Sequence, residues 1–405
     1  MTTGTRLAET TAGIDLLYRA ATGSGSVLNA EGLIPVAVAE VNPRELRDWN
    51  EATDALDALL ADIAAEGVDP LRAGWLTEMA LSLKSLVAMF AGEEIGFAQR
   101  LADQLRVDPN PVSEQRLDAE RAKLREALDE MGYRSGDLAQ DVGAWENDRT
   151  VPTEQVLAVL ADYQTEARRR CEALVLDIGD DWLKPEGVTE RPYAAYCDYP
   201  GRRVWLNLDF RYTHSDLKHL ATHEAFPGHL VHLARREALV RDGSMPLEGA
   251  QVVTCSASSA LFEGIADNGI ELLDWDGTPE DAAGLAIQRL RSALRCNASW
   301  MVCEEGRSLD EAVEATAGPA FQDAVTTRRR LDFVHHQLRA PFLFAYWCGE
   351  EEGGRCRPPL RGDDPVRPHA HASNPRCRLT ASQRDISPRR KGADRERAAS
   401  PASAR

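Results

Sequence analysis

Apolar residues recur at three- and four-residue spacing through most of this 405-residue chain up to Gly349. This spacing puts them on one face of an α-helix, because the helix has 3.6 residues per turn. The stretches with this pattern are Leu46–Ala65, Leu71–Leu105, Leu117–Met131, Val156–Leu174, Leu217–Val240 and Ala282–Cys303. Helix-start signals agree with it, namely the capping boxes Thr213 to Asp216 and Ser308 to Glu311 and the cap Thr278 before Pro279. We therefore predict a mainly α-helical fold.

In one segment, every second residue is apolar, as in a β-strand with one buried face. Val204, Leu206, Leu208 and Phe210 are apolar, and polar or aromatic residues separate them. The segment lies directly upstream of the most unusual motif of the chain. It either lines a cleft and pairs with an extended peptide, as an edge strand does, or forms part of a small hairpin.

That motif is the run His223-Glu224-Ala225-Phe226-Pro227-Gly228-His229. Histidines six residues apart on an unbroken helix point about 120° away from each other, so they could not share a metal ion. Pro227 lacks an N–H and crowds the preceding turn, and Gly228 adopts backbone angles that other residues avoid. The sequence therefore predicts a kinked or locally expanded helix that lets both imidazoles reach one point.

The motif resembles the His-Glu-x-x-Pro-Gly-His hallmark of the bacterial family known as domain of unknown function 885, whose fold is similar to the carboxypeptidase Taq metallopeptidases. Glu263-Gly264-Ile265-Ala266 stands where that family has Glu-Gly, and Tyr346-Trp347-Cys348-Gly349 stands where it often has Tyr-x-x-Gly. Many members of the family carry a second histidine directly after the motif, where this chain has Leu230. His232 could partly replace that histidine. The resemblance implies a large helical metallopeptidase-like fold with a cleft and a small β-sheet, its metal helices lying at about residues 213–275.

Catalytic zinc typically has three ligands drawn from His, Asp and Glu, with a fourth position open to water. His223, His229 and Glu263 supply such a set, with Glu271 and Glu248 as alternatives to Glu263. Glu224 is the expected general base, which takes a proton from metal-activated water. Asp267, one helical turn after Glu263, is expected to accept the second N–H of His223 and fix its orientation.

Further side chains are candidates for contact with substrate. Tyr346 either donates a hydrogen bond to the oxyanion of the transition state or packs within the last helix. Arg328, Arg329, Arg330 and Arg339 either hold a substrate carboxylate or form a solvated helix face. The remaining histidines of this region are expected to be ordinary surface or core residues; they are His214, His219, His335 and His336.

Composition excludes several classes of function. A net charge of −18 argues against nucleic acid as a partner, since phosphate backbones bind to basic surfaces. The eight cysteines include no Cys-x-x-Cys pair, so neither a disulfide framework nor a thiolate zinc site is expected. Neither a signal peptide nor an apolar run of membrane-spanning length is apparent, which favours a cytoplasmic location without membrane contact.

The chain changes character near Gly349. From Arg355 onward it has 13 Lys and Arg against 5 Asp and Glu and little apolar content. We therefore predict a helical domain over residues 1–352 and a basic, disordered tail over residues 353–405, which could be the product of a shifted reading frame.

The predicted activity is zinc-dependent hydrolysis of a peptide or small amide, most simply by a peptidase of carboxypeptidase type. The alternatives are a catalytically silent helical protein that binds a peptide or ligand and keeps the metal pocket, and a hydrolase of non-peptide amides or esters. The sequence leaves the substrate, the physiological metal and the oligomeric state open.

Overall fold

The computed structural model describes residues 2–67 and 69–355 and confirms a mainly helical fold with a small sheet. The helices before the sheet are α1 (Thr3–Thr22), α2 (Val27–Glu31), α3 (Trp49–Glu66), α4 (Pro70–Phe90), α5 (Phe97–Arg100), α6 (Glu114–Glu130), α7 (Leu138–Arg149) and α8 (Val156–Leu174). Those after it are α9 (His214–Leu220), α10 (His229–Arg241), α11 (Ser259–Asp267), α12 (Gly269–Leu272), α13 (Pro279–Cys303), α14 (Leu309–Ala317), α15 (Ala324–Arg330) and α16 (Arg339–Arg355). Two π-helical turns, η1 (Leu101–Leu105) and η3 (Ala221–Ala225), and the 3-10 turns η2 (Thr153–Gln155), η4 (Leu247–Ala250) and η5 (Asp332–His335) complete the helical elements.

The helix-start signals read from the sequence operate as predicted. Thr213, Thr278 and Ser308 each cap a helix in a complete capping box, with an acidic side chain returning to the backbone of the cap residue. The long helix predicted over Leu71–Leu105 is wrong, because α4 ends at Phe90. Gly92 follows with a φ of 93°, a left-handed conformation that a helix cannot continue through.

Strands β2 (Lys184–Val188), β3 (Ala195–Asp198) and β4 (Arg203–Asn207) form a three-stranded sheet in the order β2-β4-β3. β4 pairs in parallel with β2 and antiparallel with β3. The predicted strand is therefore the central one and ends at Asn207, so its interpretation as an edge strand that pairs with a peptide is wrong. A second, two-stranded sheet joins β1 (Val36–Ala37) to β5 (Gln251–Val252).

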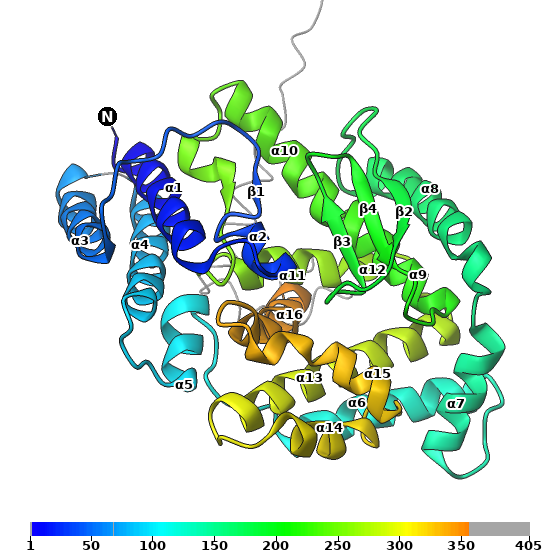
Figure 1. Cartoon of the computed structure of the whole chain (residues 1–405). Helices are drawn as coiled ribbons and strands as arrows, with labels where there is room; N and C mark the ends of the chain where they lie inside the picture. Colours follow the sequence, from blue (N-terminus) through cyan, green and yellow to red (C-terminus); the bar gives the residue numbers. More distant parts are fainter. Residues whose placement is uncertain (1, 68, 356–405) are drawn as a thin grey trace, which may run out of the picture. The chain divides into compact units, whose positions relative to one another are not determined.

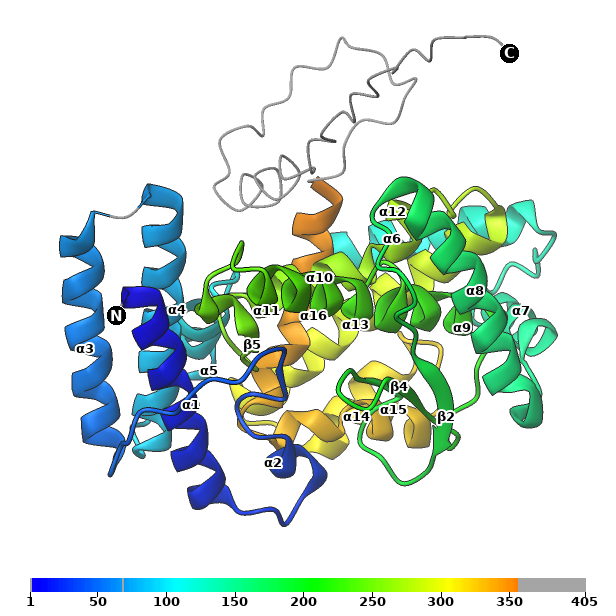
Figure 2. The same ribbon diagram turned by 90° about the horizontal axis from the view of Figure 1, so that it is seen from above.

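The elements form two regions on either side of a central pair of helices. The N-terminal helices α1, α3 and α4 pack together on one side, and the three-stranded sheet with α8, α9 and α10 lies on the other (Figures 1 and 2). Helices α11 and α16 run between them. Two buried apolar clusters follow this division, one around Leu56, Leu83 and Leu290 and one around Val204, Leu217 and Phe226.

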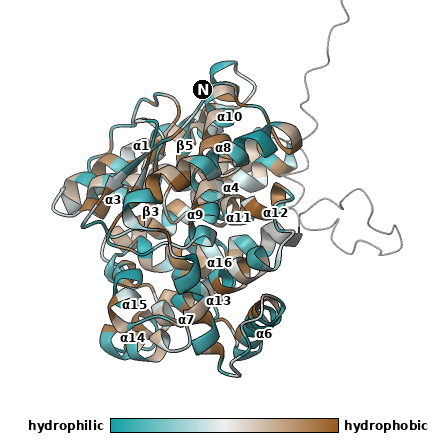
Figure 3. Ribbon diagram, turned by 90° about the vertical axis from the view of Figure 1, so that its right-hand side faces the viewer, coloured by the Kyte–Doolittle hydropathy of each residue, from teal (hydrophilic) through white to brown (hydrophobic). Residues whose placement is uncertain are grey.

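Some helices bury only a narrow stripe of apolar side chains. The hydrophilic ribbon of α6 in Figure 3 buries Leu117, Leu124 and Leu128, and this face packs on α13. Because most of its other positions are charged, α6 owes its stability to this contact more than to its composition.

Helices α11 and α16 approach each other through glycine. A Cβ atom added to Gly264 would lie 2.9 Å from the Cα of Gly349 and would overlap its carbonyl group. A Cβ added to Gly349 would lie 2.8 Å from the backbone nitrogen of Gly264. Such contacts are closer than carbon atoms tolerate, so the pair of glycines sets the distance between the two helices.

The predicted tail falls almost wholly outside the described residues. Gly353 to Arg355 belong to α16. Residues 356–405 lie beyond the part of the chain that the structure describes. Within the described part, no helix combines the length and apolar character needed to cross a membrane.

Candidate metal centre

The predicted interruption of the motif helix is present. Helix α9 passes into the π-helical turn η3, where the Phe226 N–H donates to the Ala221 carbonyl at 3.2 Å. The chain leaves the helix at Phe226 and α10 begins at His229. A Cβ on Gly228 would lie 2.5 Å from the Thr222 carbonyl oxygen and would overlap the carbonyl of His223. Only glycine therefore permits the sharp re-entry into α10 at this position.

The interruption brings the two imidazoles together. The ring centroids of His223 and His229 are 4.7 Å apart, with the rings nearly perpendicular. The Oε2 atom of Glu263 lies 3.5 Å from His223 Nε2 and 3.7 Å from His229 Nε2. One ligand atom from each of these three residues lies within 4.8 Å of the others. The geometry is that of a three-ligand cation site.

The two alternative carboxylates lie elsewhere. Glu271 contacts Arg289 at 3.3 Å, and Glu248 pairs with Arg72 at 2.5 Å. Glu263 reaches the histidines because α11 carries it, and the contact between α11 and α16 fixes the position of α11. Of the three glutamates considered from the sequence, only Glu263 joins the histidine pair.

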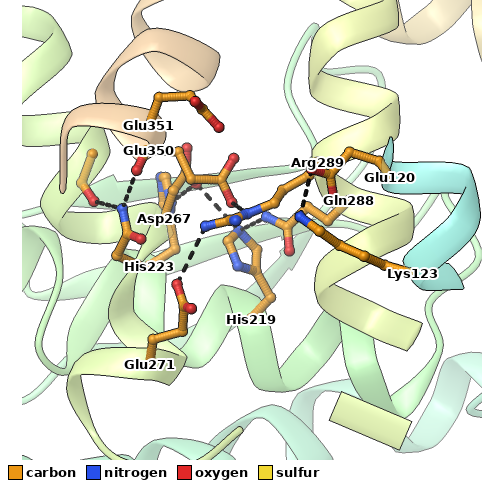
Figure 4. A network of polar contacts seen from close by, with 12 residues as sticks. Glu120, Lys123, His219, His223, Asp267, Glu271, Gln288, Arg289, Glu350 and Glu351 are labelled. Carbon is orange, nitrogen blue, oxygen red and sulfur yellow. Dashed lines mark hydrogen bonds and ion pairs between the residues drawn. The ribbon is translucent and has the colours of Figure 1, made fainter. Parts of the chain in front are cut away.

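Asp267 occupies the position expected of an orienting carboxylate. Its Oδ1 atom lies 2.8 Å from His223 Nδ1 (Figure 4). The opposite nitrogen of that ring lies 3.5 Å from Glu263. The same Oδ1 atom is 3.5 Å from His219 Nε2, and Gln288 contacts that nitrogen from the other side at 2.5 Å. This arrangement holds the His223 ring with Nε2 directed at the candidate site.

A second polar layer lies behind Asp267. Arg289 on α13 donates to Glu350 at 2.7 Å and to Glu271 at 3.3 Å, and the Asn268 side chain donates to the Glu350 carbonyl at 3.0 Å (Figure 4). These contacts tie α12, α13 and α16 together immediately behind the orienting carboxylate.

Burial dominates the electrostatics of the cluster. It raises the pKa of Glu263 to about 8 and raises the pKa of Glu224, because the charged forms lose water. It also lowers the pKa of His229 well below its ordinary value. At His223 burial again opposes the charge, but the adjacent Asp267 outweighs it and raises the pKa to about 10. The side chains thus crowd acidic groups into a buried space where a cation would be stabilised.

The cluster faces two cavities. A cavity of about 230 Å³ and a second of about 130 Å³ are both lined by His223, Glu224 and Tyr346, and His229 and Glu263 line the smaller one. Glu224 is 5% exposed, and His223 and the backbone of Cys197 in β3 partly oppose the rise that burial causes in its pKa. The ring of Tyr346 lies 6.3 Å from that of His223. Both predicted catalytic side chains therefore lie beside the metal-ligand cluster.

The other histidines divide as follows. His214 contacts the hydroxyl of Tyr163 at 3.2 Å and His336 contacts Asn29 at 2.9 Å, both away from the cluster, and His335 is exposed. His232 stacks on Phe262 with ring centroids 4.9 Å apart, lines the smaller cavity and is outside the three-ligand group. Its ring also lies 5.6 Å from that of His229, so His232 borders the cluster.

Sequence reasoning missed four contributors to the site and its cavities. His219 was expected to be an ordinary residue, although it precedes His223 by four positions, a spacing that puts two side chains on one helical face. Gln288 and Arg295, both on α13, gave no local signal, because only tertiary packing brings α13 to the larger cavity. Edge strand β3 likewise lines both cavities through Ala195 and Tyr196.

Comparisons with known proteins show the fold alone. No family model matches the chain, and no curated protein is similar to it in sequence. One similar solved structure, "the putative lipoprotein from Colwellia psychrerythraea", has 13% identity and a TM-score of 0.50, over 75% of this chain and 62% of that one. Another, "a putative lipoprotein of unknown function from Shewanella oneidensis", has 15% identity and a TM-score of 0.46, over 76% of this chain and 65% of that one. The chain thus spans less than two thirds of either protein.

These comparisons overturn the family resemblance inferred from the motif. The expected membership in the domain of unknown function 885 family, with its relation to carboxypeptidase Taq, is wrong, because no family model matches the chain and the similar structure from Colwellia psychrerythraea is titled a putative lipoprotein. A motif of seven residues describes a local backbone path and a set of side chains. It does not determine the ancestry of a chain of this length.

Proposed function

We propose that the chain is a metal-dependent hydrolase that cleaves amide bonds, most simply peptide bonds. The observation that carries this proposal is the convergence of His223, His229 and Glu263 beside the buried carboxylate of Glu224 on the wall of a cavity. The proposal rests on the chemistry of these side chains and on no relative.

The donor set suits zinc. In a tetrahedral zinc site with bonds near 2.1 Å, neighbouring ligand atoms are roughly 3.4 Å apart. The distances from Glu263 to the two histidine nitrogens, 3.5 Å and 3.7 Å, are close to that spacing. The Oε2 atom of Glu263 is also buried and has no hydrogen-bond partner among the described residues. A buried acceptor left unpaired is costly, and a cation at this point would satisfy it.

When bound, zinc would lower the pKa of a water molecule and polarise the substrate carbonyl. Glu224 would take the proton of that water and pass it to the leaving nitrogen, a task that suits a carboxylate whose pKa burial has raised. Burial also raises the pKa of Tyr346 well above its ordinary value, so its hydroxyl stays protonated and able to donate to the oxyanion. Asp267 would keep His223 oriented throughout.

The free edge of the sheet offers a place for an extended substrate. Asn207 donates to the Ala194 carbonyl at 2.8 Å, so residues 194 and 196 direct their peptide groups toward β4. The peptide groups of Ala195 and Cys197 then point to the opposite edge of β3. Ala195 lines both cavities, so a peptide could pair with it while its backbone passes the metal ligands.

Two measurements test the proposal. Element analysis of purified protein should find about one zinc per chain, and replacing both His223 and His229 by alanine should abolish its retention after dialysis. Zinc that persists in the double variant would place the metal elsewhere.

A peptide-library digest should then show hydrolysis that a chelator abolishes. Glu224→Gln should retain zinc and lower the rate by about 10²–10⁴-fold, since it removes only the proton acceptor. Glu237→Gln is the control, because Glu237 contacts Tyr199 and Arg202, and neither it nor those partners line either cavity. If wild type and Glu224→Gln both hold zinc and neither hydrolyses any peptide or ester, a silent binding protein is the better interpretation.

A further inference from the structure

The larger cavity is lined by several basic side chains. Its lining includes five arginines, although the chain as a whole has a net charge of −18. They come from α13, α15 and α16 and are Arg291, Arg295, Arg329, Arg330 and Arg339. The metal chemistry proposed above uses none of them.

Three of these arginines have structural partners. Arg291 pairs with Glu146 at 2.8 Å, Arg329 donates to the Asp209 carbonyl at 2.8 Å, and Arg339 forms an ion pair with Glu31. Their guanidinium groups hold α13, α15 and α16 to neighbouring elements.

Arg295 and Arg330 differ from the other three. Within the described ranges, neither has a carboxylate at ion-pair distance or an acceptor at hydrogen-bond distance. Each instead lies over an aromatic ring, Arg295 at 5.6 Å from the centroid of Tyr346 and Arg330 at 4.4 Å from that of Phe210. Their hydrogen-bond donors are therefore uncommitted while the aromatic rings fix their position.

The electrostatic setting favours an anion between them. Burial lowers the pKa of Arg330; Tyr212 and Asp216 oppose this effect, and the nearby charges of Arg295 and Arg291 add to it. Asp216 also lines the cavity, but its carboxylate caps α9 through the N–H and hydroxyl of Thr213. An anion between Arg295 and Arg330 would reduce the repulsion between their guanidinium groups.

The position of this pair relative to the metal ligands limits the ligand. Arg295 lies 5.6 Å from the Tyr346 ring, and that ring lies 6.3 Å from the ring of His223. Arg295 is therefore no farther from His223 than the sum of these distances, a span of roughly four residues of extended chain at about 3.3 Å each.

We propose that Arg295 and Arg330 form a carboxylate-binding subsite, and that the substrate is a peptide with a carboxylate within about four residues of the cleaved bond. This inference rests on the proposed function. The planar donor fork of arginine matches a carboxylate with two parallel hydrogen bonds, which gives direction as well as affinity. The carboxylate is either the C-terminus of the peptide or an acidic side chain, since both present the same group.

Binding to Glu224→Gln tests the subsite without turnover. The probes are N-acetyl-trialanine, its C-terminal carboxamide, and N-acetyl-Ala-Asp-Ala-carboxamide, titrated calorimetrically into the zinc-loaded protein. The free acid should bind at least about tenfold more tightly than the carboxamide, because it gains charge-assisted hydrogen bonds. Tight binding of only the aspartyl carboxamide would assign the subsite to an acidic side chain. Equal binding of all three probes, or no measurable binding of any, would overturn the proposal.

Substitutions of the two arginines test whether they cause the preference for the carboxylate. In the Glu224→Gln background, Arg295→Met and Arg330→Met keep the apolar stem and remove the fork, and each should abolish the preference for the carboxylate. Arg328→Met is the matched control, because Arg328 is on the same helix as Arg330 but pairs with Asp310 and does not line the cavity. If both Arg295→Met and Arg330→Met still bind the free acid more tightly than the carboxamide, the carboxylate site lies elsewhere.

The outcomes separate this inference from the proposed function. If Glu224→Gln binds the free acid more tightly than the carboxamide but the wild type hydrolyses no peptide, the subsite is supported and the proposed hydrolase activity is refuted. If the wild type hydrolyses the free acid and the carboxamide with equal KM, the hydrolase activity is supported and the carboxylate subsite is refuted.

Discussion

Replacing Gly349 by alanine tests how the candidate site is held together. A Cβ at this position would lie 2.8 Å from the backbone nitrogen of Gly264 and 3.0 Å from the carbonyl carbon of Ala260, and would overlap the Ala260 carbonyl oxygen. Ordinary contacts begin near 3.4 Å, so α11 and α16 must separate by at least several tenths of an ångström. All the obstructing atoms belong to the backbone, so no side chain can rotate away.

The expected loss of stability follows from two opposing effects. Overpacking of a buried contact destabilises by about 1–3 kcal/mol, and rigid backbone partners place this case at the upper end. Replacing a helical glycine by alanine returns about 0.5–1 kcal/mol through lower chain entropy. We therefore expect Gly349→Ala to lower the free energy of unfolding by about 2 kcal/mol.

The same displacement should weaken metal binding. Glu263 precedes Gly264 on α11, while both histidine ligands belong to the η3–α10 segment, so a shift of α11 moves one ligand away from the other two. We expect zinc affinity to fall by about tenfold, or ~1.4 kcal/mol. Denaturant unfolding in the presence of a chelator measures the first effect, and a zinc titration of the folded protein measures the second.

Gly143→Ala provides the matched control, because Gly143 lies inside α7 and a Cβ there meets no atom within 4 Å. That variant should be about 0.5–1 kcal/mol more stable than wild type. If Gly349→Ala were as stable as Gly143→Ala and bound zinc normally, the argument that the glycine pair sets the helix distance would be refuted.

Three further predictions concern the metal, its orienting carboxylate and pH. Zinc at about 100 times its Kd should raise the unfolding free energy by ~2.7 kcal/mol, and His229→Ala should show no such zinc dependence in denaturant titrations. Asp267→Asn should lower zinc affinity by about 10–100-fold in a competition titration, because it weakens the hydrogen bond that orients His223, and unchanged affinity would exclude that role. Burial lowers the pKa of His336 to about 4, so the stability that its neutral form contributes should be complete above about pH 6.5 and be lost as pH falls toward 4. His336→Gln should therefore remove about 2 kcal/mol of acid sensitivity in unfolding measured across that window, and an unchanged pH profile would refute it.

The sequence determined the features that depend on neighbouring residues. Apolar spacing predicted the helices, and complete capping boxes begin α9, α13 and α14 where Thr213, Thr278 and Ser308 indicated. Pro227 and Gly228 predicted the interruption between the histidines, because one lacks a donor and the other occupies a space that no Cβ could share. The spacing of Glu263 and Asp267 predicted that both would face His223, since residues four apart share a helical face.

Other features were decided by the tertiary structure. Nothing local indicated that Gly264 and Gly349 would meet, that β4 would be central and β3 the free edge, or that Arg295 and Arg330 would line one cavity. The motif also suggested a family that the comparisons do not support. The physical reason is common to all of these. Helix periodicity, caps and breaks are properties of a few consecutive residues, whereas packing distances, strand order and shared cavities depend on which distant surfaces bury each other, and a single sequence does not state those pairings.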